Sequence, residues 1–499
     1  MLPQSLLLAI LLLLPGNAHC ANQISFTSQL QLDPQHPFTL EDNQQPPHFT
    51  PSSSYPLPPT PAILKSRPTT VFRPRSLNAL HRSRLRSLRH AESELEPLAW
   101  DPTEVQGPDV EDLHTLTQLA RMSGNAYALP GQSNWYEVDQ AWNTSFPFGW
   151  EESDGFRGHV FLSSDNTTIV LSIKGTTLQG PTSKLDKFND NLLFSCCCAR
   201  VDFSWVLRTV CDCYARNFRC DNQCLTDALV QDSLFYSIGV KLVDDLRKIY
   251  PAANLWLVGH SLGGALSSLL GATYGLPAVA FESPGERLAA SRLHLPLPPP
   301  ILVPGQPPPH KKRNFFTSWL QKFPFPTSSQ PSIPVPTPPS PYPPPSPSHY
   351  PIATTHVYHT ADPIPQGTCT GSWSPCAQAG YALETRCHLG QSIIFDTVMK
   401  LGWVPNVQRH VIKQVVHNVL EADVWWGDDD EEEGDGDDDG DVEDDGSLGQ
   451  KRKGKEGEGD DNDKKKRREG RNVVPKPIIE EDCVDCYKWA FGDFKDELQ

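Results

Sequence analysis

The sequence lacks the features of a nucleic-acid-binding protein, of a repeat protein and of a protein with an ordinary membrane-spanning helix. Its 499 residues include 43 basic and 60 acidic side chains, so there is no positive excess with which to bind a phosphate backbone. No internal repeat is evident, and the apolar run at residues 6–14 has nine residues where a spanning helix needs about 20. We therefore expect no nucleic-acid partner, and nothing in the sequence indicates an obligate protein partner.

The beginning of the chain has the pattern of a secretory signal. Pro15, Gly16 and small residues around position 20 follow the apolar run, which is typical of a cleaved signal peptide. No basic residue precedes the run, which is unusual for such a signal, and an uncleaved signal anchor with a short, tilted span is the alternative. In both cases residues 1–20 direct the chain into the secretory pathway.

Three segments are too polar or too rich in proline to bury a core. Residues 296–347 contain 20 prolines in 52 positions, and residues 428–445 contain 14 acidic residues and no basic one. What remains is enough for one large globular domain. We predict 1–20 as a signal peptide or short signal anchor, 21–95 as a low-complexity lumenal arm, 96–426 as the domain with 296–347 inserted in it, 427–472 as a disordered acidic and mixed-charge tail, and 473–499 as a C-terminal segment.

Thirteen cysteines agree with an oxidising compartment, where they form disulfides. Seven of them lie between positions 196 and 224, and Cys483 and Cys486 form a C-x-x-C sequence near the end. A zinc site is the alternative, but the spacings fit no closed four-ligand pattern and no histidine lies inside the cluster. The sequons at Asn143 and Asn166 are expected to carry N-glycans in the same compartment.

The order of strand and helix patterns predicts an α/β fold. Short apolar or β-branched runs indicate strands, and apolar residues at steps of three, four and seven indicate helices. Strands in such an order form a mostly parallel sheet with helices on both faces. We expect strands at 167–177, 255–258, 278–281 and 355–359, and helices at 225–249, 265–274 and 411–426.

A serine lies in the tight turn between a predicted strand and a predicted helix. Gly259-x-Ser261-x-Gly263 is the nucleophile-elbow pattern, in which flanking glycines let the turn close and expose the serine hydroxyl. The pattern also occurs by chance, and an ordinary serine in a glycine-rich turn is the alternative. The apolar strand before it and the helix of small residues after it favour a nucleophile.

A serine nucleophile needs an imidazole base that is oriented by a carboxylate. Asp362 follows the strand predicted at 355–359 and is held by prolines, so it suits the orienting acid, although a loop-capping aspartate is the alternative. His388, His410 and His417 all follow Asp362. His410, between a loop and the last predicted helix, is the best placed of them, but position alone leaves the choice open.

Ester hydrolysis also needs two N–H donors for the oxyanion of the transition state. One is expected from Leu262, the residue after the nucleophile. The other is expected from the turn at residues 174–177, where Thr176 offers its backbone N–H and its hydroxyl.

These motifs together resemble the class 3 lipases of the α/β-hydrolase superfamily. IKGTT, NDNLLFSCCCARVD, GHSLGGALSSLLG, ESPGERLAASRLHLP and YHTADPIPQGTCTG span roughly residues 95–425 and are similar to those of the fungal autophagic-body lipase family. The resemblance implies Ser261 as nucleophile, Asp362 as acid and His410 as base, with no metal and no organic cofactor. The insertion at 296–347 and the short apolar run depart from the family pattern.

The resemblance also implies a function and a location. The function is that of a phospholipase and triacylglycerol lipase required for lysis of autophagic bodies, cytoplasm-to-vacuole bodies and multivesicular-body vesicles inside the vacuole. The partners would be the glycerolipids and phospholipids of these vesicles, anionic phosphoinositides among them. The location would be that of a single-pass type II membrane protein of the Golgi, multivesicular body and prevacuolar endosome, delivered to the vacuole lumen.

Two other functions stay open at this stage. One is a secreted triacylglycerol lipase or esterase, which localisation would distinguish. The other is a membrane-binding module without turnover, against which the presence of the serine, aspartate and histidine set argues.

Two further segments are candidates for contact with lipid. A disulfide-pinned lid around residues 196–224 would present Phe203, Trp205, Val206 and Leu207 to lipid, and a static disulfide-linked loop is the alternative. Residues 76–89 are basic with regularly placed leucines and would lie on an anionic membrane as an amphipathic helix, with a solvated arm as the alternative.

Overall fold

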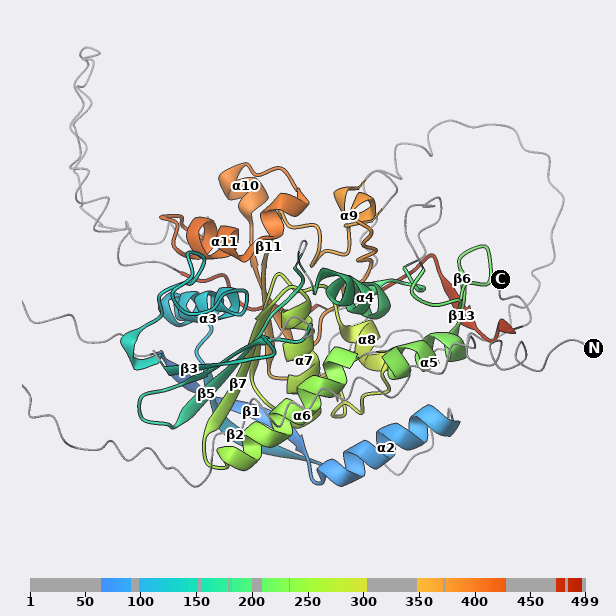
Figure 1. Ribbon diagram of the computed structural model, residues 1–499, viewed down its shortest axis with the longest axis horizontal. Helices are drawn as coiled ribbons and strands as arrows, with labels where there is room; N and C mark the ends of the chain where they lie inside the picture. Colours follow the sequence, from blue (N-terminus) through green and yellow to red (C-terminus); the bar gives the residue numbers. More distant parts are fainter. Residues whose placement is uncertain are drawn as a thin grey trace, which may run out of the picture.

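A seven-stranded sheet organises the domain, in the order β12-β11-β8-β7-β5-β4-β3 (Figure 1). Strands β5, β7, β8, β11 and β12 run parallel, whereas β3 and β4 pair antiparallel at one edge. The strands span Thr144–Phe148 (β3), Gly158–Leu162 (β4), Thr168–Ile173 (β5), Asn254–His260 (β7), Ala278–Phe281 (β8), Thr354–His359 (β11) and Gln391–Phe395 (β12). The computed structural model describes residues 64–90, 98–142, 144–150, 155–177, 180, 182–199, 209–232, 234–302, 348–370, 374–427, 473–480 and 483–495.

Each face of the sheet has its own apolar core, because alternate residues of a strand face opposite sides. In β7, Leu255 and Leu257 belong to one core and Trp256 and Val258 to the other. Helices α4, α5, α6 and α7 close the first core, and α3 and α11 close the second. The predicted parallel sheet with helices on both faces is confirmed. These helices span Leu113–Asn125 (α3), Ser183–Phe194 (α4), Asn222–Asp232 (α5), Leu234–Ile249 (α6), Leu262–Tyr274 (α7) and Ile412–Val415 (α11).

The last helix is shorter than the sequence suggests. A helix was expected over residues 411–426, but α11 continues as a single π-helical segment, η6 (Val416–Leu420), and no helix follows up to residue 427. The helix expected at 225–249 is divided between α5 and α6. Smaller helices are α8 (Arg287–Arg292), α9 (Pro375–Gln378), α10 (Thr397–Leu401), and the 3-10 turns η2 (Gln140–Trp142) and η5 (Val407–His410).

The prediction of a low-complexity arm over residues 21–95 was wrong for its second part. Strand β1 (Ser66–Pro74) pairs antiparallel with β2 (Trp100–Pro108), and helix α2 (Leu77–His90) follows β1. Leu64, Val71 and Leu80 are buried. The average composition of the segment concealed this, because a strand pair and a helix packed on one side need only a few apolar residues on one face.

Helix α2 contains the basic run and lies against the domain. Arg84 Nε donates to the carbonyl oxygen of Leu293 at 2.8 Å, and Ser87 Oγ lies 2.7 Å from His294 Nδ1. The inward side of the helix is therefore covered, which contradicts the solvated-arm alternative, while a role on anionic membranes stays a prediction. Among the described ranges, no helix has both the length and the apolar character needed to cross a bilayer.

Six disulfides join the described cysteines, so the prediction of disulfides is confirmed. Cys483 and Cys486 do not bond to each other but fasten the C-terminal segment to the domain, where β13 (Ala490–Gly492) also pairs with β6 (Arg219–Asp221). The segment predicted as separate from residue 473 onward is thus part of the domain. The six pairs are Cys196–Cys486, Cys197–Cys220, Cys198–Cys211, Cys213–Cys224, Cys369–Cys376 and Cys387–Cys483.

The proline-rich insertion leaves and rejoins the domain at one place. Strands β9 (Ile301–Leu302) and β10 (Ser348–His349) pair antiparallel, so the two ends of the insertion are adjacent. Residues 303–347 lie outside the described residues, as do the predicted signal segment, the acidic tail and Asn143. Asn166 is exposed in the turn between β4 and β5, and glycosylation at both asparagines stays a prediction.

Candidate active site

Ser261 lies in the turn from β7 to α7 with an unusual backbone conformation. Its φ is 58° and its ψ is −129°, a region that residues other than glycine rarely adopt. A Cβ on Gly259 would lie 2.4 Å from the Gly263 carbonyl carbon, and a Cβ on Gly263 would lie 2.1 Å from the carbonyl oxygen of Ile173. Glycine is therefore required at both positions, because the neighbouring backbone occupies the space of a side chain.

The three side chains predicted as a catalytic set lie in hydrogen-bond contact. The hydroxyl of Ser261 donates to His410 Nε2 at 2.8 Å, and His410 Nδ1 donates to Asp362 Oδ2 at 2.6 Å. The serine follows β7, the aspartate follows β11, and the histidine ends η5. Ser261 and Asp362 are buried, whereas 14% of the His410 side chain is exposed. This order of hydroxyl, imidazole and carboxylate is the one that activates a serine.

The two other candidate histidines lie elsewhere. His388 Nδ1 donates to Glu480 Oε1 at 2.8 Å, and His388 Nε2 donates to the carbonyl oxygen of Ser283 at 3.1 Å. His417 lies 2.7 Å from Glu421 Oε2 near the exposed side of the last helix. Of the three histidines that the sequence left open, the structure brings His410 to Ser261.

The carboxylate of Asp362 is held on both oxygens. Oδ2 accepts from His410, and Oδ1 accepts the backbone N–H of Ile364 at 2.9 Å. Burial by itself would raise the pKa of Asp362, but the charge and hydrogen bond of His410 outweigh it, and this pKa lies below its ordinary value. The aspartate is therefore ionised when it faces the imidazole.

A second histidine positions the backbone of the first. His260 Nε2 donates to the carbonyl oxygen of His410 at 2.7 Å, which leaves His260 Nδ1 to accept from the hydroxyl of Tyr127 at 2.9 Å. Burial, together with the charge of His410, lowers the pKa of His260 to about 3. His260 is thus neutral, with one tautomer fixed by its two partners.

The turn predicted to supply an oxyanion donor lies against the elbow. A Cβ on Gly175 would lie 2.2 Å from the carbonyl oxygen of His260 and 3.0 Å from Ser261 Cβ. Leu262 is the first residue of α7, where N–H groups have no acceptor inside the helix. The turn and the start of the helix therefore converge beside the Ser261 hydroxyl.

A buried ion pair holds this turn in place. Lys174 Nζ donates to Asp186 Oδ2 at 2.8 Å, and the same carboxylate oxygen accepts the backbone N–H of Thr177 at 2.9 Å. The two charged side chains are 3% and 1% exposed. Burial lowers the pKa of Lys174 in spite of the charge of Asp186.

The hydroxyl of Thr176 is already engaged. It donates to Asp190 Oδ2, so its proton is committed, and the backbone N–H of Thr176 remains the candidate oxyanion donor. Burial raises the pKa of Asp190 to about 8. Sequence reasoning missed Asp186 and Asp190, because nothing in the α4 sequence shows that they point to the turn.

One buried cluster has the donor types of a metal site. The donor atoms of Glu286, His356 and His388 all lie within 4.8 Å of one another. Burial alone would lower the pKa of His388, but the hydrogen bond and charge of Glu480 raise it to about 9. A histidine that donates from both ring nitrogens has no lone pair for a metal. We interpret the cluster as a charge network that ties the C-terminal segment to β8 and β11.

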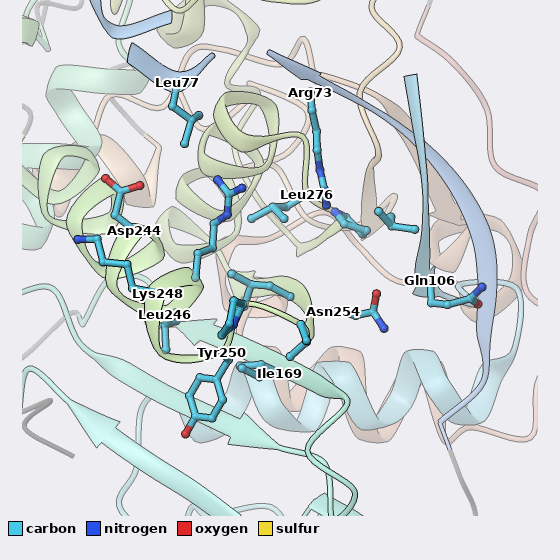
Figure 2. Close-up of a pocket in the computed structure, with 17 residues that line it drawn as sticks. Arg73, Leu77, Gln106, Ile169, Asp244, Leu246, Lys248, Tyr250, Asn254 and Leu276 are labelled. Atoms are coloured by element: carbon cyan, nitrogen blue, oxygen red, sulfur yellow. The ribbon is translucent and has the colours of Figure 1, made fainter. Parts of the chain in front are cut away.

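A cavity of about 540 Å³ (Figure 2) lies where the parallel strands begin. Ser261 follows β7 at the other end of these strands. Ile169, Asn254 and Leu276 line the cavity near the beginnings of β5, β7 and β8, together with Arg73 and Tyr250. Strand β7 has 7 residues, so its two ends are roughly 20 Å apart. An ester bound in this cavity would not reach Ser261.

The predicted lid residues Phe203, Trp205, Val206 and Leu207 lie outside the described residues. The disulfide Cys198–Cys211 closes the base of that segment. The lid and the static loop both stay predictions.

Comparison with known proteins decides the family. Residues 199–276 match the family described as Lipase (class 3). A protein of Cryptococcus neoformans var. neoformans serotype D (strain JEC21) named "Putative lipase ATG15" is 44% identical over 420 residues, which are 79% of this chain and 70% of that protein. The chain belongs to the ATG15 lipase family.

Other relatives in the ATG15 family carry the same name. The protein of Mycosarcoma maydis is 38% identical over 416 residues, 79% of this chain and 69% of its own length. That of Saccharomyces cerevisiae (strain S288c) is 42% identical over 337 residues, 66% of this chain and 55% of its own length. The solved nonglycosylated LIP2 lipase of Yarrowia lipolytica covers 56% of this chain and 78% of its own at 17% identity and a TM-score of 0.27, too distant to inform the site.

Membership of the ATG15 family confirms the class 3 lipase resemblance and the α/β-hydrolase fold. Lipases hydrolyse carboxylic esters, so the family assigns the general activity. Ser261 and Gly263 lie within the matched residues 199–276, whereas Asp362 and His410 lie beyond them.

Proposed function

We propose that this member of the ATG15 family is a serine lipase and phospholipase that hydrolyses the glycerolipid esters of vesicle membranes inside the vacuole. The observation that supports the proposal is the chain of hydrogen bonds from Ser261 through His410 to Asp362 at a strained strand-to-helix turn. The family resemblance supports the process, which is lysis of autophagic bodies, cytoplasm-to-vacuole bodies and multivesicular-body vesicles.

The chemistry is that of a two-step acyl transfer. Ser261 Oγ attacks the ester carbonyl carbon while His410 Nε2 takes the hydroxyl proton, and Asp362 stabilises the resulting imidazolium. His410 then returns the proton to the leaving alcohol, and the acyl group stays on Ser261. Water, activated by His410 in the same way, attacks the acyl-enzyme and releases the fatty acid.

The backbone N–H groups of Leu262 and Thr176 stabilise the oxyanion in this proposal. Both come from elements that meet at the elbow, and the ion pair of Lys174 and Asp186 keeps the turn in place. Losing one such donor typically reduces kcat by about a hundredfold or more.

The predicted signal segment, the disulfides and the family resemblance support a proposal for the location. Six disulfides suit an oxidising compartment, which supports passage through the secretory pathway. We propose a type II membrane protein of the Golgi, multivesicular body and prevacuolar endosome that is delivered to the vacuole. Recovery of a cleaved, freely secreted form would favour a secreted lipase instead.

The test is fatty-acid release from phospholipid vesicles and from triacylglycerol emulsion by the wild type and Ser261→Ala, at acidic and neutral pH. Ser291→Ala, which removes an exposed serine, is the matched control. We expect release by the wild type and the control, and a loss of about a thousandfold or more in Ser261→Ala. If the wild type binds vesicles without hydrolysing either substrate, the protein is a binding module and the proposal fails. Vesicles with and without phosphoinositides test the preference for anionic lipid.

A further inference from the structure

We infer that Glu282 is a positioning residue of this site, a protonated carboxyl group that donates a hydrogen bond to Asp362 and thereby holds the aspartate against His410. The inference rests on the proposed function and adds the pH range in which the site works. Glu282 directly follows β8, and nothing in the sequence motif assigns it a role.

The first argument is the contact between two carboxyl groups. Glu282 and Asp362 are both fully buried, and their carboxyl groups lie close enough for a hydrogen bond to form between them. A hydrogen bond between two carboxyl oxygens needs a proton, and two neighbouring carboxyl groups in a buried site cannot both be kept ionised. One of the two groups is therefore protonated.

The partners of each group decide where the proton lies. Asp362 accepts from His410 Nδ1 at 2.6 Å and from the Ile364 N–H at 2.9 Å, which favours its ionised form. Within the described residues, Glu282 Oε1 accepts a single backbone N–H, that of His359, at 3.1 Å. Glu282 Oε2 is buried and receives no donor from the described part of the chain, as expected for the oxygen that carries the proton.

Among the described residues, no lysine or arginine forms an ion pair with Glu282. His359 Nε2 lies 3.8 Å from Glu282 Oε1, but burial lowers the pKa of His359, which favours the neutral form of this ring. Tyr358 lies on the same strand, and His410 lies beyond Asp362. Burial, and then the negative charge of Asp362, raise the pKa of Glu282 well above its ordinary value.

The backbone conformation of Glu282 also indicates that the fold imposes the position of this residue. Glu282 has a φ of 46°, in the left-handed region that side-chain-bearing residues seldom occupy, and its N–H donates to the carbonyl oxygen of Val357 at 2.9 Å. Such a conformation persists only where the surroundings impose it, and it occurs preferentially at functional sites.

The consequence is an alkaline limit to activity. When Glu282 loses its proton, the hydrogen bond to Asp362 is lost and two buried negative charges repel each other. Asp362 then no longer holds the His410 imidazole toward Ser261. A glutamine at 282 keeps an N–H donor at every pH, whereas a leucine has none.

The first experiment compares the pH profiles of kcat/KM for wild type, Glu282→Gln and Glu282→Leu on a soluble short-chain ester. Glu282→Gln should keep activity within about threefold at acidic pH and extend the alkaline limb by about one pH unit or more. Glu282→Leu should lose about tenfold or more in kcat with little change in KM. Glu384→Gln is the control, because burial raises the pKa of Glu384 to about 7 while its carboxylate contacts the backbone of Cys196 and none of the three proposed catalytic residues, so its alkaline limb should match wild type.

The inference is overturned if the alkaline limbs of wild type and Glu282→Gln coincide, if Glu282→Gln is as impaired as Glu282→Leu, or if Glu282→Leu behaves as wild type. A second measurement does not depend on catalysis. The unfolded chain releases the Glu282 proton at a lower pH than the folded chain, so wild-type stability falls with rising pH above the ordinary glutamate pKa. The unfolding constant of wild type relative to Glu282→Gln should rise by up to about tenfold per pH unit above pH 5.

A flat ratio of the two unfolding constants overturns the inference even if the enzyme proves inactive. If wild type and Ser261→Ala hydrolyse the ester equally, the proposed function fails while the stability measurement still decides whether Glu282 holds a proton.

Discussion

His260 Nε2 donates to the carbonyl oxygen of His410 at 2.7 Å, so the residue before the proposed nucleophile fixes the backbone of the residue that would activate it. The hydroxyl of Tyr127 in turn donates to His260 Nδ1 at 2.9 Å. The position of the imidazole thus depends on a chain that begins just after helix α3, far from the elbow in the sequence.

Tyr127→Phe should lower kcat by about tenfold with little change in KM, because His260 loses the partner that fixes its tautomer and orientation. Steady-state kinetics on a soluble ester measure the effect. Tyr381→Phe is the control, since the buried hydroxyl of Tyr381 has no hydrogen-bond partner within the described ranges. Equal kinetics for the two variants would show that the Tyr127 hydroxyl does not support His410.

Gly263→Ala should destabilise the fold and abolish activity, because the new Cβ would lie 2.1 Å from the carbonyl oxygen of Ile173. Gly271→Ala, in the same helix, brings its Cβ to 3.0 Å from the carbonyl oxygen of Leu276, a milder contact, and should lose less stability than Gly263→Ala and keep its activity. Thermal unfolding and ester hydrolysis of both variants measure these effects on stability and activity. A Gly263→Ala protein with wild-type activity would contradict the close approach of β5 to the elbow.

The two aspartates of α4 should respond in opposite ways to replacement by asparagine. Asp186→Asn leaves the buried charge of Lys174 unpaired, which should cost about 3–5 kcal/mol and loosen the oxyanion turn. The pKa of Asp190 in the folded protein is about 8, so this side chain is protonated at neutral pH. Asp190→Asn should therefore be at least as stable as wild type at neutral pH.

Urea unfolding with the disulfides intact, repeated between pH 4 and 8, measures both variants. The unfolded chain ionises Asp190 near its ordinary pKa of 3.8 while the folded chain does not, so the advantage of Asp190→Asn should grow as the pH rises through this range. A constant difference would show that Asp190 is ionised in the folded protein.

Glu480→Gln should destabilise the domain by about 3 kcal/mol near pH 6, because it removes the partner of the buried His388. The pKa of Glu480 is lowered to about 2, so its contribution to folding stability is fully present above pH 4.5 and is lost as the pH falls from 4.5 to 2. The raised pKa of His388, about 9, gives stability that is complete below pH 6.5 and lost as the pH rises through 9. The ion pair of His388 and Glu480 therefore stabilises the folded domain most between pH 4.5 and 6.5.

Glu111→Gln is the matched control, since Glu111 is 57% exposed and its ion pair with Arg67 should contribute less than about 1 kcal/mol. Chemical unfolding of both variants at pH 5.5 and pH 9.5 completes the test. If Glu480→Gln costs no more than Glu111→Gln at pH 5.5, the C-terminal segment is not held by this pair.

Local sequence patterns were sufficient to predict the central strands and the turn that contains Ser261. Residues 255–258 and 278–281 are apolar throughout, as strands buried on both faces must be, and glycines two positions from Ser261 mark a turn that admits no Cβ. Strand β12 was not predicted, because its five residues have neither a long apolar run nor a clear turn signal. The β1–β2 pair and helix α2 within residues 64–108 were not predicted for a similar reason, because their buried residues are few.

The sequence by itself determined the α/β class and the lipase family and singled out Ser261 as the candidate nucleophile, because these depend on residues that are close together in the chain. Only the tertiary structure decided which histidine meets the serine, which cysteines pair, and that Glu282, Asp186 and His260 support the site. Those relationships join residues separated by tens to hundreds of positions. Only the folding of the chain brings them within hydrogen-bond distance, so no local pattern records them.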